Sequence, residues 1–319
     1  MLSRIAESLF WVGRYLERAE DTARLVDVQI HQLLENATTD EASAARALLS
    51  VMGVSEDAVA PELGAVVERL AFDEREPSSI VSSLMSARAN AAGARESISS
   101  ELWECLNATY VALEQRSAAG RAMGPNAFFR FARYVKDRVA LAAGIADSTL
   151  SRDEGWWFCI LGRSIERVDM TVRLLSVRLS LPEYESDWVT TLRSCSAHEA
   201  YLKTYGGTVE GPRALEFLLL DRLFPRSVYL SLTVALDCLT ELDPEADRSG
   251  HGGDAHRVLG RARASLEYHG IDEMLAELPE LLGSIQRTCA QATAALSAQY
   301  FQTDPVIAWR VGTPQAPRH

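Results

Sequence analysis

Residues 13–25 read GRYLERAEDTARL, and residues 162–174 read GRSIERVDMTVRL. Seven of these thirteen positions are identical, at an offset of 149 residues. In both segments apolar residues return at intervals of three and four, which is the spacing of an amphipathic helix. Each segment is therefore predicted to lie on a long helix, and their recurrence predicts two related halves.

The same apolar periodicity extends outward from both segments. It runs from Leu2 to Leu33, and it returns in windows at 43–53, 61–73, 78–116, 126–149, 151–180, 183–205, 212–241, 255–268 and 279–302. Strand patterns are nearly absent. The chain is predicted to be all-α, a multi-helix bundle of two pseudo-repeat halves that pack as one body, each led by a long Glu-Arg helix. The halves are residues 1–150 and 151–302, and residues 303–319 form an extended tail.

Composition limits the possible functions. The 319 residues are 47% hydrophobic and 24% charged, which suits a globular protein with a sizeable core, and the net charge is −12. An acidic balance argues against a general nucleic-acid or membrane surface. Five scattered cysteines suggest neither a disulfide framework nor a zinc knuckle. Charged residues in the first turns break the apolar core that a signal peptide needs, and no apolar run has the length of a membrane span, so a cytoplasmic protein is expected. No cofactor is expected.

A charged stripe accompanies the apolar seam on both predicted helices. On a helical wheel Glu17, Glu20 and Arg24 share one face over three turns, and Arg14 and Arg18 lie further round. The second segment keeps this pattern with Arg163, Glu166, Arg167, Asp169 and Arg173. Core packing explains why an apolar seam recurs, but it does not require polar residues to recur at the same offsets.

Three interpretations of the stripes remain open. In the first interpretation, the charged residues form surface ion pairs, each worth about 0.2–0.5 kcal/mol. Alternatively, the two leading helices lie side by side, and the stripes converge at the centre to hold a polar ligand or to close an Arg-Glu network. In the third interpretation, carboxylate pairs on two helices bind two metal ions. The Glu-x-x-His pairs of such sites are absent and the arginines would repel a cation, so no metal is predicted.

Three stretches resemble the bacterial alpha-E domain family. Residues 1–20, MLSRIAESLFWVGRYLERAE, are similar to the opening of that family. Residues 87–107 resemble its A-R-E-N-A-R segment, although Ala89 and Ala92 replace a Glu and an Arg, and FPRSV at 224–228 is similar to its F-P-R-S-V segment. The resemblance covers nearly the whole chain. It implies a helical fold without an established reaction, encoded beside or fused to a circularly permuted ATP-grasp ligase-like protein and often a transglutaminase-like protease.

Two of these segments suggest binding residues. Because proline suits the first turn of a helix, Arg226 and Ser227 are placed at a helix N-terminus, where phosphate or carboxylate binding is the alternative to an ordinary helix start. Arg88, Asn90 and Arg95 span two turns, and we place them opposite the acidic stripe as a hypothesis. The loop with His251, Asp254 and His256 is interpreted as a solvated linker in preference to a metal site.

No nucleotide-binding or nucleophile-elbow motif is present, so the sequence does not decide whether the chain is an enzyme. The preferred interpretation is a helical partner of an ATP-grasp-type amide or peptide ligase, which binds that protein or its peptide-like ligand through the Arg-Glu cluster. One alternative is an enzyme that uses the convergent carboxylates and arginines, with or without a metal. The other is a homo-oligomer whose stripes form the subunit interface. Neither a nucleic acid nor a membrane is an expected partner.

Overall fold

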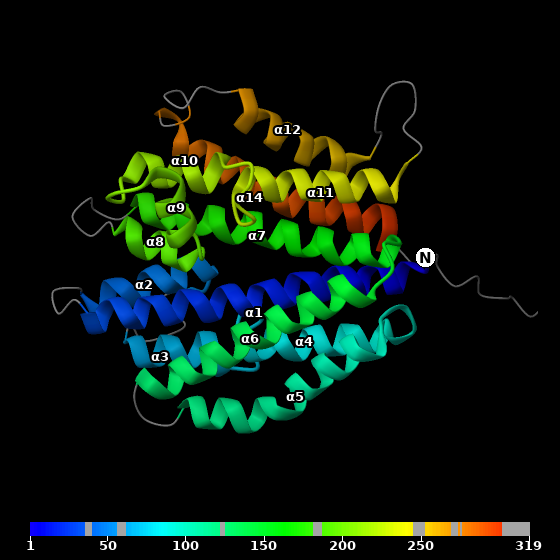
Figure 1. Cartoon of the computed structure of the whole chain (residues 1–319), viewed down its shortest axis with the longest axis horizontal. Coiled ribbons are helices and arrows are strands. Elements are labelled where there is room, and N and C mark those ends of the chain that lie inside the picture. The colour runs from blue at the N-terminus through cyan, green and yellow to red at the C-terminus, as the bar shows by residue number, and fades with distance from the viewer. Residues whose placement is uncertain are drawn as a thin grey trace, which may run out of the picture.

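The computed structural model describes residues 1–35, 40–55, 62–121, 125–180, 187–244, 253–268, 274 and 276–301. Within these ranges the chain forms helices and no strand, which confirms the all-α prediction. Two long helices, α1 (Ser3–Glu35) and α7 (Glu154–Ser180), lie side by side across the middle of the molecule and run in the same direction (Figure 1). The other helices pack around this pair.

The elements that precede α7 in the chain are α2 (Glu41–Met52), α3 (Leu63–Val67), the π-helical turn η2 (Glu68–Phe72), α4 (Ile80–Gly93), the 3₁₀ turn η3 (Arg95–Ser97), α5 (Ser100–Arg121) and α6 (Pro125–Thr149). In Figure 1, α3, α4, α5 and α6 form the lower group, and α2 lies above α1. Those that follow α7 are α8 (Trp188–Ser194), α9 (His198–Tyr205), α10 (Gly211–Leu220), α11 (Val228–Leu242), α12 (Asp254–Tyr268), α14 (Leu278–Leu296) and the π-helical turn η5 (Ser297–Phe301). In Figure 1, α11, α12 and α14 lie on the far side of α7 from α4 and α5.

Three predicted helical windows are each divided in two by polar capping groups or turns. The hydroxyl of Ser99 accepts a hydrogen bond from the backbone N–H of Leu102 and starts α5 inside window 78–116. Ser196 has a φ of 56° and separates α8 from α9. The carboxylate of Asp221 accepts backbone N–H groups of the turn between α10 and α11. The spacing of apolar residues indicates which face of a helix is buried, but it does not indicate where the helix is interrupted.

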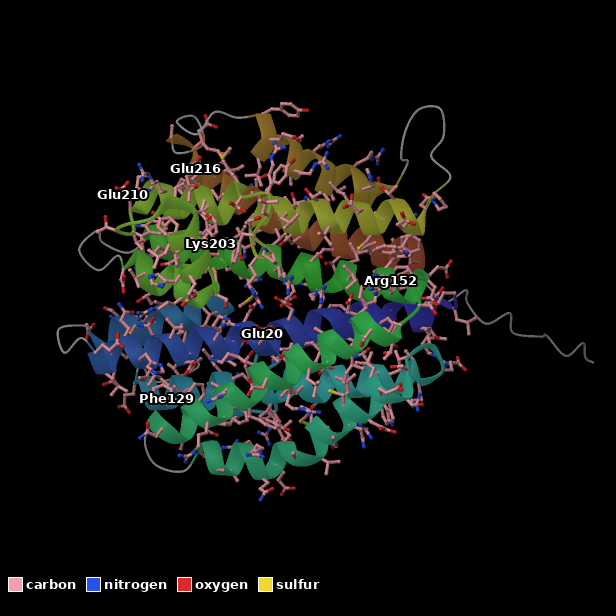
Figure 2. All side chains as sticks on the ribbon, in the orientation of Figure 1. Glu20, Phe129, Arg152, Lys203, Glu210 and Glu216 are labelled. Atoms are coloured by element: carbon pink, nitrogen blue, oxygen red, sulfur yellow. The ribbon has the colours of Figure 1, made fainter. Side chains whose placement is uncertain are left out.

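One hydrophobic core contains residues from both sides of position 150, so the two predicted halves share it. Phe10 of α1 packs against Phe301 of η5, and Phe158 of α7 contacts the same ring. Lys203 of α9 and Glu210, which precedes α10, are exposed, whereas Glu20 of α1 is half-buried and lies near the middle of the view in Figure 2. None of the helices in the described ranges combines the length and apolar character needed to cross a bilayer. The tail at 303–319 lies outside the described residues.

Candidate functional site: an arginine–carboxylate network between α1 and α7

Two glycines let α1 and α7 approach until their backbones touch. A Cβ atom on Gly13 would lie 2.0 Å from the carbonyl oxygen of Cys159, and one on Gly162 would lie 2.0 Å from the carbonyl oxygen of Phe10. The contact is reciprocal, because Phe10 and Cys159, the residues that the two glycines meet, are themselves 149 positions apart. This approach brings the carboxylates one turn further on, Glu17 and Glu166, between the helices.

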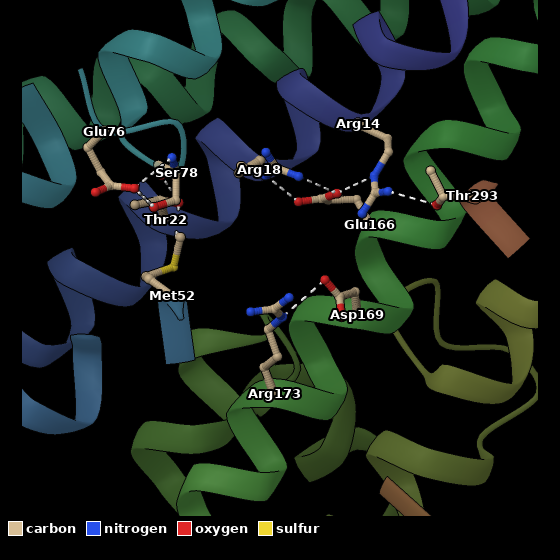
Figure 3. Close-up of polar contacts among 10 residues, drawn as sticks. All are labelled: Arg14, Arg18, Thr22, Met52, Glu76, Ser78, Glu166, Asp169, Arg173 and Thr293. Carbon is tan, nitrogen blue, oxygen red and sulfur yellow. Dashed lines mark hydrogen bonds and ion pairs between the residues drawn. The ribbon is translucent and has the colours of Figure 1, made fainter. Parts of the chain in front are cut away.

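Glu166 of α7 binds two arginines of α1. Its carboxylate accepts from Nε of Arg14 and from Nε of Arg18, each at 2.6 Å, and its side chain is 1% exposed (Figure 3). Arg14 also donates to the hydroxyl of Thr293 in α14 at 3.0 Å. Burial raises the pKa of Glu166, but the charges and hydrogen bonds of the two arginines outweigh it and lower the pKa to about 2. Glu166 is therefore ionised.

Glu17 of α1 occupies the corresponding place and binds arginines from two other segments. Its carboxylate accepts from Nε of Arg167 at 2.6 Å and from Arg226 at 2.7 Å, and its side chain is also 1% exposed. Arg226 further contacts Glu20 at 2.9 Å, and it donates to Asp21. Burial raises the pKa of Glu17, and the charges of Arg226 and Arg167 outweigh it and lower the pKa. Arg226 thus ties the loop before α11 to α1.

Two pairs within single helices extend the cluster. Arg173 donates to Asp169 at 3.0 Å, as Figure 3 shows. Arg24 donates to Glu20 at 2.5 Å. We call the whole set the central network: Arg14, Glu17, Arg18, Glu20, Asp21, Arg24, Arg163, Glu166, Arg167, Asp169, Arg173 and Arg226. The predicted convergence of the two stripes is confirmed, and its Glu17 and Glu166 are buried. Sequence reasoning missed Asp21, which follows Glu20 directly.

The hypothesis that Arg88, Asn90 and Arg95 lie opposite the acidic stripe is wrong. The guanidinium of Arg88 donates to Asn107 of α5 at 3.3 Å, and both Arg88 and Arg95 lie over the ring of Trp103. Asn90 donates to a backbone carbonyl of its own helix. These side chains do not face the acidic stripe, because α4 buries Ala87 and Ala91, and Arg88 of α4 and Arg95 of η3 are directed to α5. They form a separate aromatic–arginine surface.

The prediction for the start of α11 is also corrected. Ser227 is the N-cap, since its hydroxyl accepts from the backbone N–H of Leu230 and donates to the carbonyl of Asp221. Pro225 lies before the helix and not in its first turn. Ser227 thus satisfies part of the helix start, and the anions that Arg226 binds are carboxylates of this chain.

The central network holds helices together and offers little for catalysis. Both oxygens of Glu166 and Oε1 of Glu17 accept from guanidinium groups, whose positive charge opposes the binding of a metal ion. Among the described residues no three His, Cys, Asp or Glu side chains are grouped to bind one. Burial raises the pKa of Cys195 and Cys238 to about 12, so these thiols stay protonated. His251 of the predicted linker lies outside the described residues.

Asp21 is expected to make stability depend on pH. Burial raises its pKa to about 7, with Glu17 and Glu20 adding to the rise and Arg226 opposing it. The folded protein therefore retains a proton that the unfolded chain, with a pKa of 3.8, has lost, and stability falls as pH rises through this window. Asp21→Asn should remove this fall in urea unfolding curves measured from pH 4 to 8. Asp137→Asn, an exposed change, should follow the wild-type curve; a common slope for all three proteins would contradict the prediction.

Comparison with known proteins agrees with this geometry. A family model described as a predicted alpha-helical domain with a conserved ER motif matches residues 1–301. The chain belongs to the Alpha-E family. In this Alpha-E protein the Glu-Arg dipeptides at 17–18 and 166–167 bridge to one another across the two helices, Glu17 to Arg167 and Glu166 to Arg18.

Three similar proteins belong to mycobacteria. Uncharacterised proteins of Mycobacterium bovis and of two strains of Mycobacterium tuberculosis are each 26% identical to this Alpha-E chain over 322 aligned positions, which cover 92% of the chain. The chain spans only 36% of the length of these relatives. No solved structure matches it.

Proposed function

We propose that this chain is a helical binding partner of an ATP-grasp-type amide or peptide ligase in the cytoplasm and does not itself carry out the chemistry. The observation that carries the proposal is the pairing of the carboxylates in the central network. Its two most buried carboxylates are neutralised by arginines of the same chain, as a structural element requires and a general acid or base does not. The ATP-grasp partner is implied by the family resemblance.

The length of the relatives supports a partner function. An Alpha-E unit that makes up about a third of a longer chain is covalently joined to further sequence in the mycobacterial proteins. A fused unit and a separate partner can do the same work, because fusion only raises the effective concentration of two proteins that already bind each other.

The aromatic–arginine surface of α4 and α5 is the face that we assign to the partner. The guanidinium of Arg88 lies 5.3 Å from the ring centre of Trp103 and 4.9 Å from that of Tyr110. Val111, the next residue, is 70% exposed. Arginine, tryptophan and tyrosine are enriched among the residues that dominate the binding energy of protein interfaces, and here they lie on the same helices as an exposed apolar side chain.

A binding experiment tests this function. The chain and a circularly permuted ATP-grasp-type protein from the same source should co-elute in size-exclusion chromatography, and the complex should change ATP turnover. Val111→Asp should weaken the complex by about tenfold or more, since a charge would be desolvated in the interface. Tyr268→Asp, at a hydrophobic position on α12 that is 82% exposed, should leave it intact.

The outcomes separate the candidate functions. The partner proposal is wrong if neither a complex nor a change in turnover is observed. Turnover of a substrate by the chain alone, lost on replacing a network carboxylate that leaves the protein folded, would favour the enzyme alternative instead.

A further inference from the structure

The central network carries more positive than negative charge. It contains seven arginines but five carboxylates, so two arginine charges lack a counterpart even when every acid is ionised. The chain as a whole has a net charge of −12, so this excess is a local feature. A partly buried excess of positive charge is costly unless an anion neutralises it.

Arg163 is the arginine without a partner. Its Nε is buried and has no hydrogen-bond acceptor among the described residues, and none of their carboxylates pairs with it. Arg14 is its counterpart 149 positions earlier, and that guanidinium is satisfied by both Glu166 and Thr293. Arg163 as a whole is only partly buried, so part of its side chain faces solvent at the edge of the central network, although its Nε is buried.

The structure shows why the two arginines differ. The hydroxyl of Thr22 donates to the carbonyl of Ser78, and the hydroxyl of Thr171 donates to the carbonyl of Arg226. Ser78 and Arg226 therefore occupy corresponding places in the turns before α4 and α11. An arginine stands in the second turn only, and its guanidinium binds Oε1 of Glu17, the oxygen that also accepts from Arg167. Glu17 is thus neutralised by two arginines without Arg163.

The second partner of Arg14 also has no equivalent. The residue 149 positions before Thr293 is Gly144 in α6, which has no hydroxyl. Gly144 is exposed, and a Cβ atom on it would meet no other atom within 4 Å, so this position offers Arg163 no acceptor. Both interactions that satisfy Arg14 are thus absent for Arg163.

From these observations we propose that Arg163 and Arg167 bind a small oxyanion, a carboxylate or a phosphate, at the edge of the central network. The two arginines lie one turn apart on α7, and Arg167 uses Nε for Glu17. Planar guanidinium groups bind carboxylate and phosphate oxygens in pairs, whereas chloride offers no such geometry. The bound ion supplies the negative charge that the network lacks. This site does not depend on the proposed ligase partner.

Thermal unfolding of the full chain tests the site. Sodium phosphate and sodium acetate are each compared with sodium chloride at equal ionic strength and pH 7. An ion that binds only the folded state at roughly ten times its Kd should raise the Tm of the wild-type protein by about 2–5 °C. Arg163→Gln should lose this shift, and Arg133→Gln, at a solvent-exposed position on α6, should keep it. The larger shift identifies the preferred class, phosphate or carboxylate.

Direct observation of the arginine makes the test independent of the variant's folding. In the wild-type protein, titration with phosphate or acetate should move one arginine Nε–Hε NMR signal along a saturable curve, and Arg163→Lys should remove that signal. The proposal is overturned if neither anion exceeds chloride, or if Arg163→Gln and the wild type respond equally, since the effect would then be general to the solvent.

Discussion

Replacing Glu166 with glutamine is expected to lower the free energy of unfolding by about 3–5 kcal/mol, the usual cost of breaking a buried ion pair by removing one partner. The substitution changes volume little, but it leaves the guanidinium groups of Arg14 and Arg18 facing a neutral amide. Arg18 has a partly exposed side chain, whereas that of Arg14 is almost buried, so most of the cost arises from Arg14. Urea unfolding followed by circular dichroism measures the loss.

Glu68→Gln is the matched control for this prediction. Glu68 also pairs with an arginine, Arg121 at 2.9 Å, but both side chains are exposed, so a loss of less than about 1 kcal/mol is expected. Equal losses in the two variants would mean that burial of the central network contributes nothing. A pH series adds a second readout, because the pKa of Glu166 is lowered from 4.5 to about 2. Wild-type stability that depends on this carboxylate should be lost as pH falls through that window, and the variant should not show the loss.

The centre of the fold was predictable from the sequence because the signal there is repeated. Two segments with the same apolar seam and the same polar offsets leave few arrangements in which both seams are buried and both stripes have partners. The prediction that the leading helices lie side by side follows, and the burial of Glu17 and Glu166 agrees with it. Gly13 and Gly162 belong to the same repeat, but only the coordinates show that the two helices touch at these positions.

Other parts of the site were not predictable, because they depend on where a helix lies relative to its neighbours. A helical wheel shows that Arg88 and Arg95 share a face, but it does not show that this face meets α5. Arg226 reaches Asp21 across 205 residues from a turn, and local spacing has no information about such a contact. Its partner on α1 was therefore missed, and its own role was predicted as anion binding at a helix start.

Replacing Gly13 with alanine is expected to destabilise the protein by about 3 kcal/mol or more, at the upper end of overpacking effects. The new Cβ would lie 2.0 Å from the carbonyl oxygen of Cys159 and 2.9 Å from the backbone nitrogen of Arg163, and neither atom can rotate away. The helices would have to separate until these distances exceed about 3 Å, which also lengthens the nearby 2.6 Å bond between Glu17 and Arg167. Chemical denaturation measures the loss. Gly144→Ala, with open space around it, should instead stabilise α6 by up to about 1 kcal/mol.

The reciprocal glycine allows a sharper test of the same contact. Gly162→Ala alone should cost about as much as Gly13→Ala, since its Cβ would lie 2.0 Å from the carbonyl oxygen of Phe10. If both glycines serve one close approach, separating the helices relieves both clashes at once, and the double variant should lose clearly less than the sum of the single losses. Additive losses would show that the two clashes are relieved by independent local shifts. In that case the ion pairs of the central network, and not backbone contact, would set the distance between α1 and α7.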